Sequence, residues 1–536
     1  MFFFYPLASI LGVSLREGGP WGSDVIGRLF SSWIYVRVLW FTTWQAALST
    51  VLTLAVALPG AYVFARYRFP GKTLILSLTA VPFVLPSVVV AAAFQALLGE
   101  RGLLNGWLMG ALNLPSPPIT LDHTIWFILL AHVFYNYSVI VRIVGNYWSR
   151  LRPVTAEAAK MLGASPWRVF FEITVPLLMP AILAASMLVF IFCFSSFGVI
   201  LILGGPRFST IEVEIYRQAV HLFNLPMAAV LSLLQILLTL AFMGVYTTLQ
   251  RSSSLPVYTE SRSVTEKRIT GMKDWIFVGA NGLVILILLC APIAALMVRS
   301  FHAQDGFTLD FYRSLFMYRD QSLFPIAPIA ATLYSVGFAL STLVLSVSIA
   351  LPAAVLLTWH RFRIVRFLDP VLMLPLATSA VTLGFGFIIA LDEPPLNLRT
   401  SLALIPLAHT LVAYPFVVRS VLPALRSIPK ELKEAASILG ATPLQVFFGV
   451  IMPIVSRAVM VGAVFAFTIS IGEFGATVLV ARPQTPTMTL AIYRFLGQPG
   501  EMNYGCAMAM STLLMAVTAG GFLLLDRIRI AREGEF

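Results

Sequence analysis

Two glutamates open the same short pattern in distant parts of this 536-residue sequence. Glu157 begins EAAKMLGASPWRVFFEITVP, and Glu434 begins EAASILGATPLQVFFGVIMP. Each copy places a Glu-Ala-Ala helix before a glycine, a hydroxyl residue followed by proline, and a second proline. These are residue types of helix ends and tight turns. The chemistry they favour is a shaped surface that docks into a groove on another protein.

The pattern predicts two short helices at a tight angle, forming a knob. The glycine takes the left-handed conformation past the first helix end. A hydroxyl then caps the second helix, a proline starts it, and a last proline bounds it. In the order of the two copies, these residues are Gly163 and Gly440, Ser165 and Thr442, Pro166 and Pro443, and Pro176 and Pro453. The alternative is that each knob packs against the protein's own helix ends. Recurrence in both halves favours two identical docking partners.

The repeat extends far beyond the knobs. The offset of 434 − 157 = 277 also relates His132 to His409, and Phe197-Gly198 to Phe474-Gly475. Upstream the offset becomes 293, as in Pro82 and Pro375, so the first half carries a longer loop near residues 95–123. The chain therefore contains two tandem copies of one unit. We expect units at 1–250 and 274–536, joined by a polar cytoplasmic linker at 251–273.

Composition indicates that these units lie in a membrane. Hydrophobic residues make up 59% of the chain and charged residues 11%, against about 25% charged in soluble domains. We predict an all-α integral membrane protein with about 12 transmembrane helices in two six-helix units. The apolar runs lie near 39–65, 74–98, 124–146, 179–203 and 226–249, then 275–298, 331–357, 367–391, 401–422, 455–480 and 504–526.

The first helix and the basic residues bear on topology. Pro6 matches Pro292, so Met1 falls inside a helix. We expect that the first helix is truncated because the true start codon lies upstream. The alternative is a genuinely short or re-entrant first helix. Placing both knobs in the cytoplasm puts most of the 36 basic residues on the inner side, as membrane proteins prefer. All six lysines then lie inside: Lys72, Lys160, Lys267, Lys273, Lys430 and Lys433. The basic charge thus reflects topology, and we expect lipid contact and no nucleic-acid partner.

Several chemistries are not supported by the sequence. Gly71-Lys72-Thr73 resembles part of a phosphate loop, but Arg66 stands where its first glycine is required. No hydrolase or metalloprotease motif occurs. Three unpaired cysteines in apolar runs indicate core residues rather than a disulfide framework or a metal site: Cys193, Cys290 and Cys506. We therefore expect no catalytic residue, no metal and no cofactor bound by this chain.

A few polar groups inside the apolar runs are candidates for a pathway across the membrane, where such groups are costly. These candidates are Glu473, Ser195, Ser196, His132 and His409. For Glu473, contact with interfacial water or capping of a neighbouring helix is an equal alternative. For the equivalent histidines, a shared role in helix packing is the stronger alternative.

The two knobs and the tandem units resemble the permease of a binding-protein-dependent ABC importer. The resemblance implies the type I importer permease fold, with each knob serving as a coupling helix in a cleft of an ATPase subunit. Within that superfamily the chain is similar to the fused permeases of thiamine and iron(III) importers. The stretch from Cys193 to Pro206, with Thr210-Ile211-Glu212, is most like the thiamine type. Gly472-Glu473-Phe474-Gly475 is shared more broadly, with permeases of the iron(III), molybdate and polyamine types, and so does not decide the cargo.

The resemblance implies roles and partners for this chain. The coupling loops would be 157–176 and 434–453. Their interface residues would be Glu157, Ala158, Ala159, Gly163, Pro166 and Pro176, with Glu434, Ala435, Ala436, Gly440, Pro443 and Pro453. Partners would be two copies of a cytoplasmic ABC ATPase, which uses ATP and magnesium, and an extracytoplasmic solute-binding protein. The location would be the cytoplasmic (inner) membrane of a bacterium or archaeon.

The cargo most favoured is thiamine, with iron(III) as the alternative on the same architecture. Two other classes remain open. A secondary transporter with duplicated halves would carry ion-coupling carboxylates or broken helices at the membrane midplane. A channel or receptor scaffold would have no ATPase partner at all.

Overall fold

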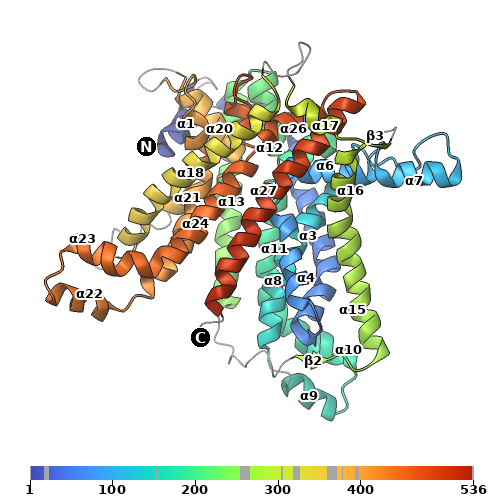
Figure 1. Cartoon of the computed structure of the whole chain (residues 1–536), viewed down its shortest axis with the longest axis vertical. Helices are drawn as coiled ribbons and strands as arrows, with labels where there is room; N and C mark the ends of the chain where they lie inside the picture. Colours follow the sequence, from blue (N-terminus) through green and yellow to red (C-terminus); the bar gives the residue numbers. More distant parts are fainter. Residues whose placement is uncertain are drawn as a thin grey trace.

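The chain folds almost entirely into helices (Figure 1). The computed structural model describes residues 2–16, 23–151, 154–253, 266–303, 306–317, 326–358, 371–376, 378–392 and 397–533. Within these residues, ten helices are long and apolar enough to cross a membrane. Three shorter apolar helices also occur. Phe4–Leu15 and Ala380–Ala390 complete two sets of six, and Lys72–Val84 precedes the break before Ser87. The all-α prediction with two six-helix units is therefore confirmed.

The first half contains α1 to α13. Its helices are α1 (Phe4–Arg16), α2 (Ser23–Ser31), α3 (Trp33–Arg66), α4 (Lys72–Leu78), α5 (Val81–Val84), α6 (Ser87–Leu98), α7 (Leu103–Leu112), α8 (Ile125–Arg150), α9 (Val154–Met161), α10 (Pro166–Val169), α11 (Val175–Phe194), α12 (Ile211–Tyr216) and α13 (Leu225–Ser253). Helix α7 lies in the longer loop of this half and projects sideways in Figure 1.

The second half repeats this order. Its helices are α15 (Met272–Ile285), α16 (Ala291–Phe301), α17 (Asp310–Leu315), α18 (Ile329–Leu356), α20 (Ala380–Ala390), α21 (Leu404–Arg426), α22 (Lys430–Ile438), α23 (Pro443–Val446), α24 (Met452–Gly472), α25 (Thr477–Val480), α26 (Met488–Leu496) and α27 (Glu501–Glu533). Two minimal sheets occur: β1 (Tyr67–Arg68) pairs in parallel with β2 (Lys267–Arg268), and β3 (His302–Ala303) pairs antiparallel with β4 (Gly306–Phe307).

Equivalent hydrogen bonds confirm both offsets of the repeat. In the first half, the Thr42 hydroxyl accepts a hydrogen bond from the Ile211 amide at 3.1 Å. In the second half, the Ser335 hydroxyl accepts one from the Met488 amide at 2.8 Å. Since 335 − 42 = 293 and 488 − 211 = 277, one bond tests both registers at once. In each copy a hydroxyl on a long helix satisfies the free N–H at the start of a short one.

The two halves exchange their first helices across a shared interface. Helix α16 packs against α6 of the first half and against α27, while α1 packs against α20 of the second half and against α13. Helix α1 therefore has the place in its unit that α16 has in the other, as the Pro6 and Pro292 match predicts. Helices α6 and α20 each lie between elements of both halves.

Four predicted continuous spans are broken. The runs predicted at 74–98 and 367–391 are interrupted before α6 and α20, where Pro86 and Ser379 precede the new helix. The runs predicted at 179–203 and 455–480 end early, at Phe194 and Gly472. Residues 359–370 and 377 lie outside the described part of the chain. Prolines without an N–H and a capping serine explain the first two breaks. Such breaks at membrane depth are tolerated where they line a cavity.

Polar contacts fasten the start of the second half to the end of α3. The ammonium of Lys72 lies 2.7 Å from a carboxylate oxygen of Glu266, and the Tyr67 hydroxyl donates to Asp274 at 2.9 Å. Most of the predicted linker, residues 254–265, lies outside the described residues. Lys72, the lysine of the near-match to a phosphate loop, thus binds the segment beside strand β2.

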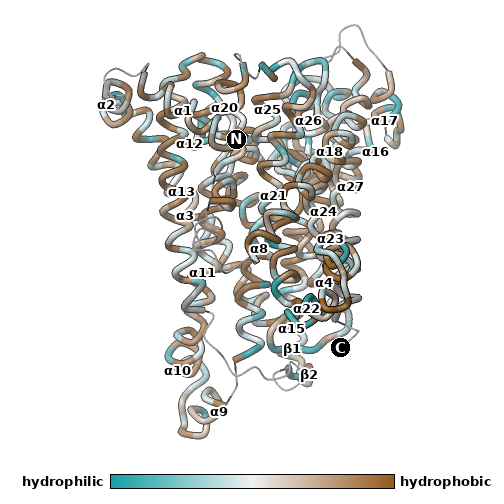
Figure 2. The backbone as a smooth tube through the Cα atoms, turned by 90° about the vertical axis from the view of Figure 1, so that its left-hand side faces the viewer, coloured by the Kyte–Doolittle hydropathy of each residue, from teal (hydrophilic) through white to brown (hydrophobic). Residues whose placement is uncertain are grey.

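The molecule has two hydrophilic ends separated by apolar helices (Figure 2). Helix α9 and helices α22 and α23 lie toward the lower end, apart from each other, and α27 runs toward the same end (Figure 1). Helices α12, α17 and α26 lie at the upper end. The two knobs therefore share one end of the molecule.

Candidate functional site

The turn of each knob has the geometry that its glycine predicts. Gly163 has φ +85° and Gly440 has φ +87°. The Ala164 amide donates to the carbonyl of Ala159 at 3.0 Å, and the equivalent bond in the second copy measures 3.1 Å. A bond from the residue after a left-handed glycine back across five residues is the Schellman helix end. The two knobs therefore share one turn conformation, with nearly the same backbone φ at the glycine and the same closing hydrogen bond.

The second helix of each knob starts at its hydroxyl cap. The Ser165 hydroxyl accepts from the amide three residues later at 3.3 Å. Thr442 accepts from Gln445 in the same way, and the Gln445 side chain accepts from the Thr442 amide at 2.8 Å. This pair is a full capping box. Pro166 and Pro443 occupy the first turn.

The prediction that Pro176 and Pro453 end a separate second helix is wrong. Helix α10 continues through a π-helical turn, Phe170–Thr174, into α11, and α23 continues likewise through Phe447–Ile451 into α24. Because proline cannot donate to a carbonyl one turn earlier, a wider turn before it accommodates the missing bond. Each knob is thus one short helix joined to the end of a spanning helix.

The tips of both knobs expose large apolar side chains. Met161 and Leu162 are 90% and 89% exposed, and the equivalent Ile438 and Leu439 are 84% and 88% exposed. Glu157 and Glu434 are exposed as well. Self-packing of the knobs, the alternative weighed from the sequence, does not cover these tips. Exposed apolar side chains at equivalent places are typical of interaction surfaces.

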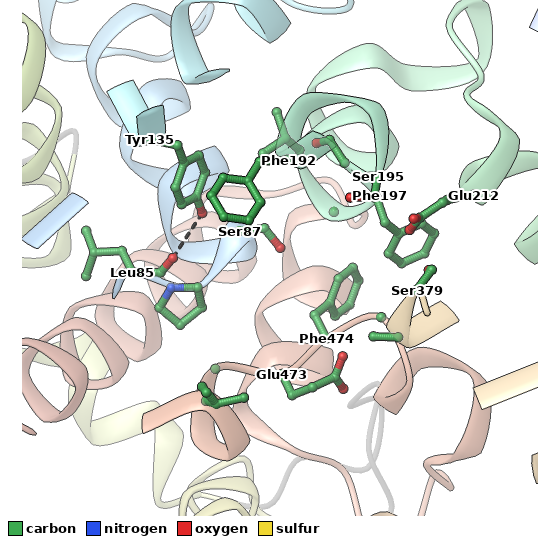
Figure 3. A pocket seen from close by; sticks show the side chains of 18 of the residues that line it. Leu85, Ser87, Tyr135, Phe192, Ser195, Phe197, Glu212, Ser379, Glu473 and Phe474 are labelled. Carbon is green, nitrogen blue, oxygen red and sulfur yellow. Dashed lines mark hydrogen bonds between the residues drawn. The ribbon is translucent and has the colours of Figure 1, made fainter. Parts of the chain in front are cut away.

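A cavity of about 450 Å³ lies between the two halves at the broken spans (Figure 3). The first half contributes the ends of α5 and α11. The second half contributes the start of α20 and the segment that follows α24. Its lining includes four of the five predicted pathway residues: His132, Ser195, Ser196 and Glu473. The fifth, His409, is not among the lining residues.

Each histidine ties its own helix to neighbouring elements of the same half. His132 lies 2.9 Å from the Ser49 hydroxyl through Nδ1 and 3.0 Å from the Ser196 hydroxyl through Nε2. His409 lies 2.8 Å from the hydroxyls of Ser470 and Thr477. Both rings are fully engaged inside their own half, which is the packing role weighed as an alternative.

Glu473 caps the short helix that follows it. One carboxylate oxygen accepts from the Ala476 amide at 2.9 Å, and the other accepts from the Thr477 amide at 3.0 Å. His409 Nε2 lies 3.4 Å from the second oxygen. The carboxylate borders the cavity, but its hydrogen bonds hold the segment after α24 in place.

Further lining residues were not predicted from the sequence. Glu212, on α12, is 2% exposed and borders the cavity, and one of its oxygens accepts from Gln235 at 3.2 Å. Phe197 and Phe474 also line it. The repeat register had already paired these two phenylalanines. The two glutamates, Glu212 and Glu214, in the otherwise apolar hexamer Ile211–Tyr216 were a further available signal.

Comparison with known proteins identifies the fold family. The profile described as "Binding-protein-dependent transport system inner membrane component" matches the chain twice, at residues 57–255 and 343–529. The two matches correspond to the two repeated halves.

Several curated relatives align along nearly the whole chain. The thiamine transport system permease protein ThiP of Brucella abortus (strain 2308) is 28% identical over 534 residues, covering 98% of this chain and 93% of the relative. The protein of the same name from Salmonella typhimurium is 26% identical, with coverage of 97% and 94%. A probable ABC transporter permease protein, y4fN, from Sinorhizobium fredii is 24% identical, with coverage of 99% and 94%.

Proposed function

Because the chain belongs to the binding-protein-dependent transport system inner membrane component family, we propose that it is the permease of a thiamine importer. A member of this family is a transport permease and not an enzyme. The observation that carries the cargo proposal is the alignment of 98% of the chain with permeases named for thiamine transport. The cavity adds support, since its lining offers aromatic rings and carboxylates to an organic cation.

The two knobs are proposed as the docking sites for two ATPase subunits. Each exposes one carboxylate and two large apolar side chains at equivalent positions. Two equal surfaces suit two copies of one partner better than one asymmetric partner. ATP and magnesium would be used in those subunits. The proposed interface comprises Glu157, Ala158, Ala159, Gly163, Pro166 and Pro176, and Glu434, Ala435, Ala436, Gly440, Pro443 and Pro453.

A continuous helix connects each proposed docking site to the cavity. The helical run Pro166–Phe194 has 29 residues, which is about 43 Å at 1.5 Å per residue. It starts at the knob and ends next to Ser195 and Ser196 of the cavity wall. The run Pro443–Gly472 ends in the same way next to Glu473. Movement of a docked subunit would therefore reach the cavity through one rigid element.

We further propose that the knobs face the cytoplasm of a bacterial or archaeal cell. This orientation puts most basic residues on the inner side of the membrane. The upper end in Figure 1, with α12, α17 and α26, would then face an extracytoplasmic solute-binding protein. The two domains would be 1–250 and 274–536, with residues 251–273 as the linker.

Uptake in cells tests the cargo. Labelled thiamine and labelled ferric iron would be supplied in parallel to cells with and without this gene, after starvation for each. Loss of thiamine uptake alone supports the proposal. Loss of iron uptake alone would assign the protein to iron(III) import instead, and unchanged uptake of both would reject both cargoes.

A further inference from the structure

Four aromatic rings form a continuous row across the boundary between the two halves. The Phe197 and Phe474 rings stack with centroids 5.6 Å apart and planes 28° apart. Tyr216 meets Phe197 at 5.7 Å, and Tyr493 meets Phe474 at 5.3 Å. The pairs are related by the repeat, since 474 − 197 and 493 − 216 are both 277. The stacked pair therefore sits where the two equivalent halves meet.

Two glycines beside the stacked rings are closely packed. A Cβ added to Gly198 would lie 2.2 Å from the Ser87 hydroxyl oxygen and 3.1 Å from the Phe474 ring. A Cβ added to Gly472 would lie 2.9 Å from the Pro86 ring, which belongs to the other half. Both glycines thus permit close approach at the boundary. In this structure the halves are in direct contact here.

The row lies between the cavity and the end opposite the knobs. Phe197 and Phe474 line the cavity, whereas Tyr216 and Tyr493 belong to α12 and α26 at the upper end of the molecule (Figure 1). The phenylalanine pair therefore lies on the boundary that a solute would follow between the upper end and the cavity.

The surroundings of the ring pair favour a cation. In the view of Figure 3, Phe197 and Phe474 lie between the carboxylates of Glu212 and Glu473. No lysine or arginine is found among the described residues that line the cavity. In addition, the buried side-chain oxygen of Asn136, on the cavity wall, has no hydrogen-bond partner among the described residues. A donor group on a solute can satisfy that acceptor.

We propose that Phe197 and Phe474 form the gate on the side opposite the knobs, and that they take a planar aromatic cation between their faces as it opens. This inference rests on the proposed import function and names the solute chemistry of that pathway. A flat ring between two others needs about 3.5 Å on each side, hence a separation of about 7 Å. The Phe197 and Phe474 centroids are only 5.6 Å apart, so the pair as it stands has no room for such a ring and must open to admit one.

Leucine and tyrosine substitutions test the role of the rings. The permease would be purified with its ATPase, reconstituted in vesicles and supplied with binding protein and labelled thiamine. Phe197→Leu and Phe474→Leu keep an apolar side chain but remove the aromatic face, so we expect KM to rise about tenfold, the equivalent of about 1.4 kcal/mol. Phe474→Tyr keeps the ring and should stay near the wild-type KM. An unchanged KM in both leucine variants would overturn the stacking site.

A matched control lies on α11, the helix that ends shortly before Phe197. Phe190 contacts Phe194 and Phe242 within the first half and does not line the cavity. Phe190→Leu removes an equal aromatic surface and should leave KM unchanged. An equal rise in KM for Phe190→Leu would mean that general packing, and not the gate, explains the effect.

Cross-linking gives a second test if the leucine variants fail to fold. Phe197→Cys and Phe474→Cys would be combined after the native Cys193, Cys290 and Cys506 are replaced by alanine. A short bifunctional thiol reagent should join the two halves and abolish the remaining uptake of the double variant, while the same reagent should not change the uptake of either single-cysteine variant. Uptake that persists after cross-linking, or thiols that cannot be joined, would contradict the gate.

The two failures are distinguishable. If wild-type vesicles take up no thiamine, the cargo proposal fails, and with it the assigned solute; the effect of the cross-link on ATP hydrolysis stimulated by the binding protein still tests the gate. If wild-type vesicles take up thiamine and the leucine variants match them, only the ring site fails.

Discussion

The left-handed glycine of each knob offers a quantitative test of docking. Gly440 has φ +87°, and in the described part of the chain no atom lies within 4 Å of an added Cβ. A side chain there meets no neighbour, so its cost is confined to the backbone, about 1–2 kcal/mol for a residue with a Cβ in this conformation. That cost lowers the population of the turn about 5–30-fold. If docking needs the turn, the apparent Kd for the ATPase rises by the same factor.

The assay is a titration of the detergent-solubilised permease with its purified ATPase, comparing Gly440→Val with Gly440→Asn. Asparagine tolerates the left-handed conformation far better than a β-branched residue, and Asn113 already adopts φ +51° in this chain. We therefore expect a clear loss of affinity for valine and a small one for asparagine. Combining valine at Gly440 and Gly163 should weaken both docking sites.

Gly449→Val is the matched control. Gly449 lies in the π-helical turn that follows the same knob. An added Cβ there would contact no described residue, and its φ is not positive. It should bind the ATPase like the wild type. If Gly440→Val also binds like the wild type while remaining folded, the turn is not required for docking. If asparagine is as damaging as valine, backbone strain is not the cause.

Three further predictions concern the fold around the cavity. Gly198→Ala should impair folding or uptake because its Cβ would lie 2.2 Å from the Ser87 hydroxyl oxygen. Adding Ser87→Ala should partly restore both folding and uptake. No restoration would show that a contact other than the Ser87 hydroxyl excludes the added methyl group. Ser335→Ala removes the acceptor of a buried backbone N–H and should lower the free energy of unfolding by about 1–3 kcal/mol. The measurement is the unfolding midpoint in detergent. An unchanged midpoint would refute the capping role of Ser335. Lys72→Ala and Glu266→Ala should each lower thermal stability by at most about 1 kcal/mol, and a double-mutant cycle without coupling would show that the 2.7 Å pair contributes nothing.

The repeat made much of this architecture predictable from the sequence. Two constant offsets paired His132 with His409 and Gly163 with Gly440. The structure buries both histidines on equivalent helices and gives both glycines a positive φ. The knob turns were also predictable, because a glycine, a capping hydroxyl and a proline act over a few residues. Local chemistry of this kind depends little on tertiary packing.

The broken spans and the ring pair could not be predicted in the same way. An apolar run reads the same whether the helix is continuous or interrupted, so the break before α6 was hidden. Pro176 was expected to end a helix, but a π-helical turn carries the chain past it. The offset of 277 residues paired Phe197 with Phe474 but gave no information on the distance between their rings. Their contact follows from how the two halves meet.

ATP-dependent accumulation of thiamine in vesicles tests the central claim most directly. The complex of permease and ATPase would be reconstituted with binding protein outside the vesicles and nucleotide inside. We predict accumulation with magnesium and ATP, none with a non-hydrolysable analogue, and none for Gly163→Pro combined with Gly440→Pro. Accumulation driven by an ion gradient in the absence of ATP would contradict the account and favour a secondary transporter.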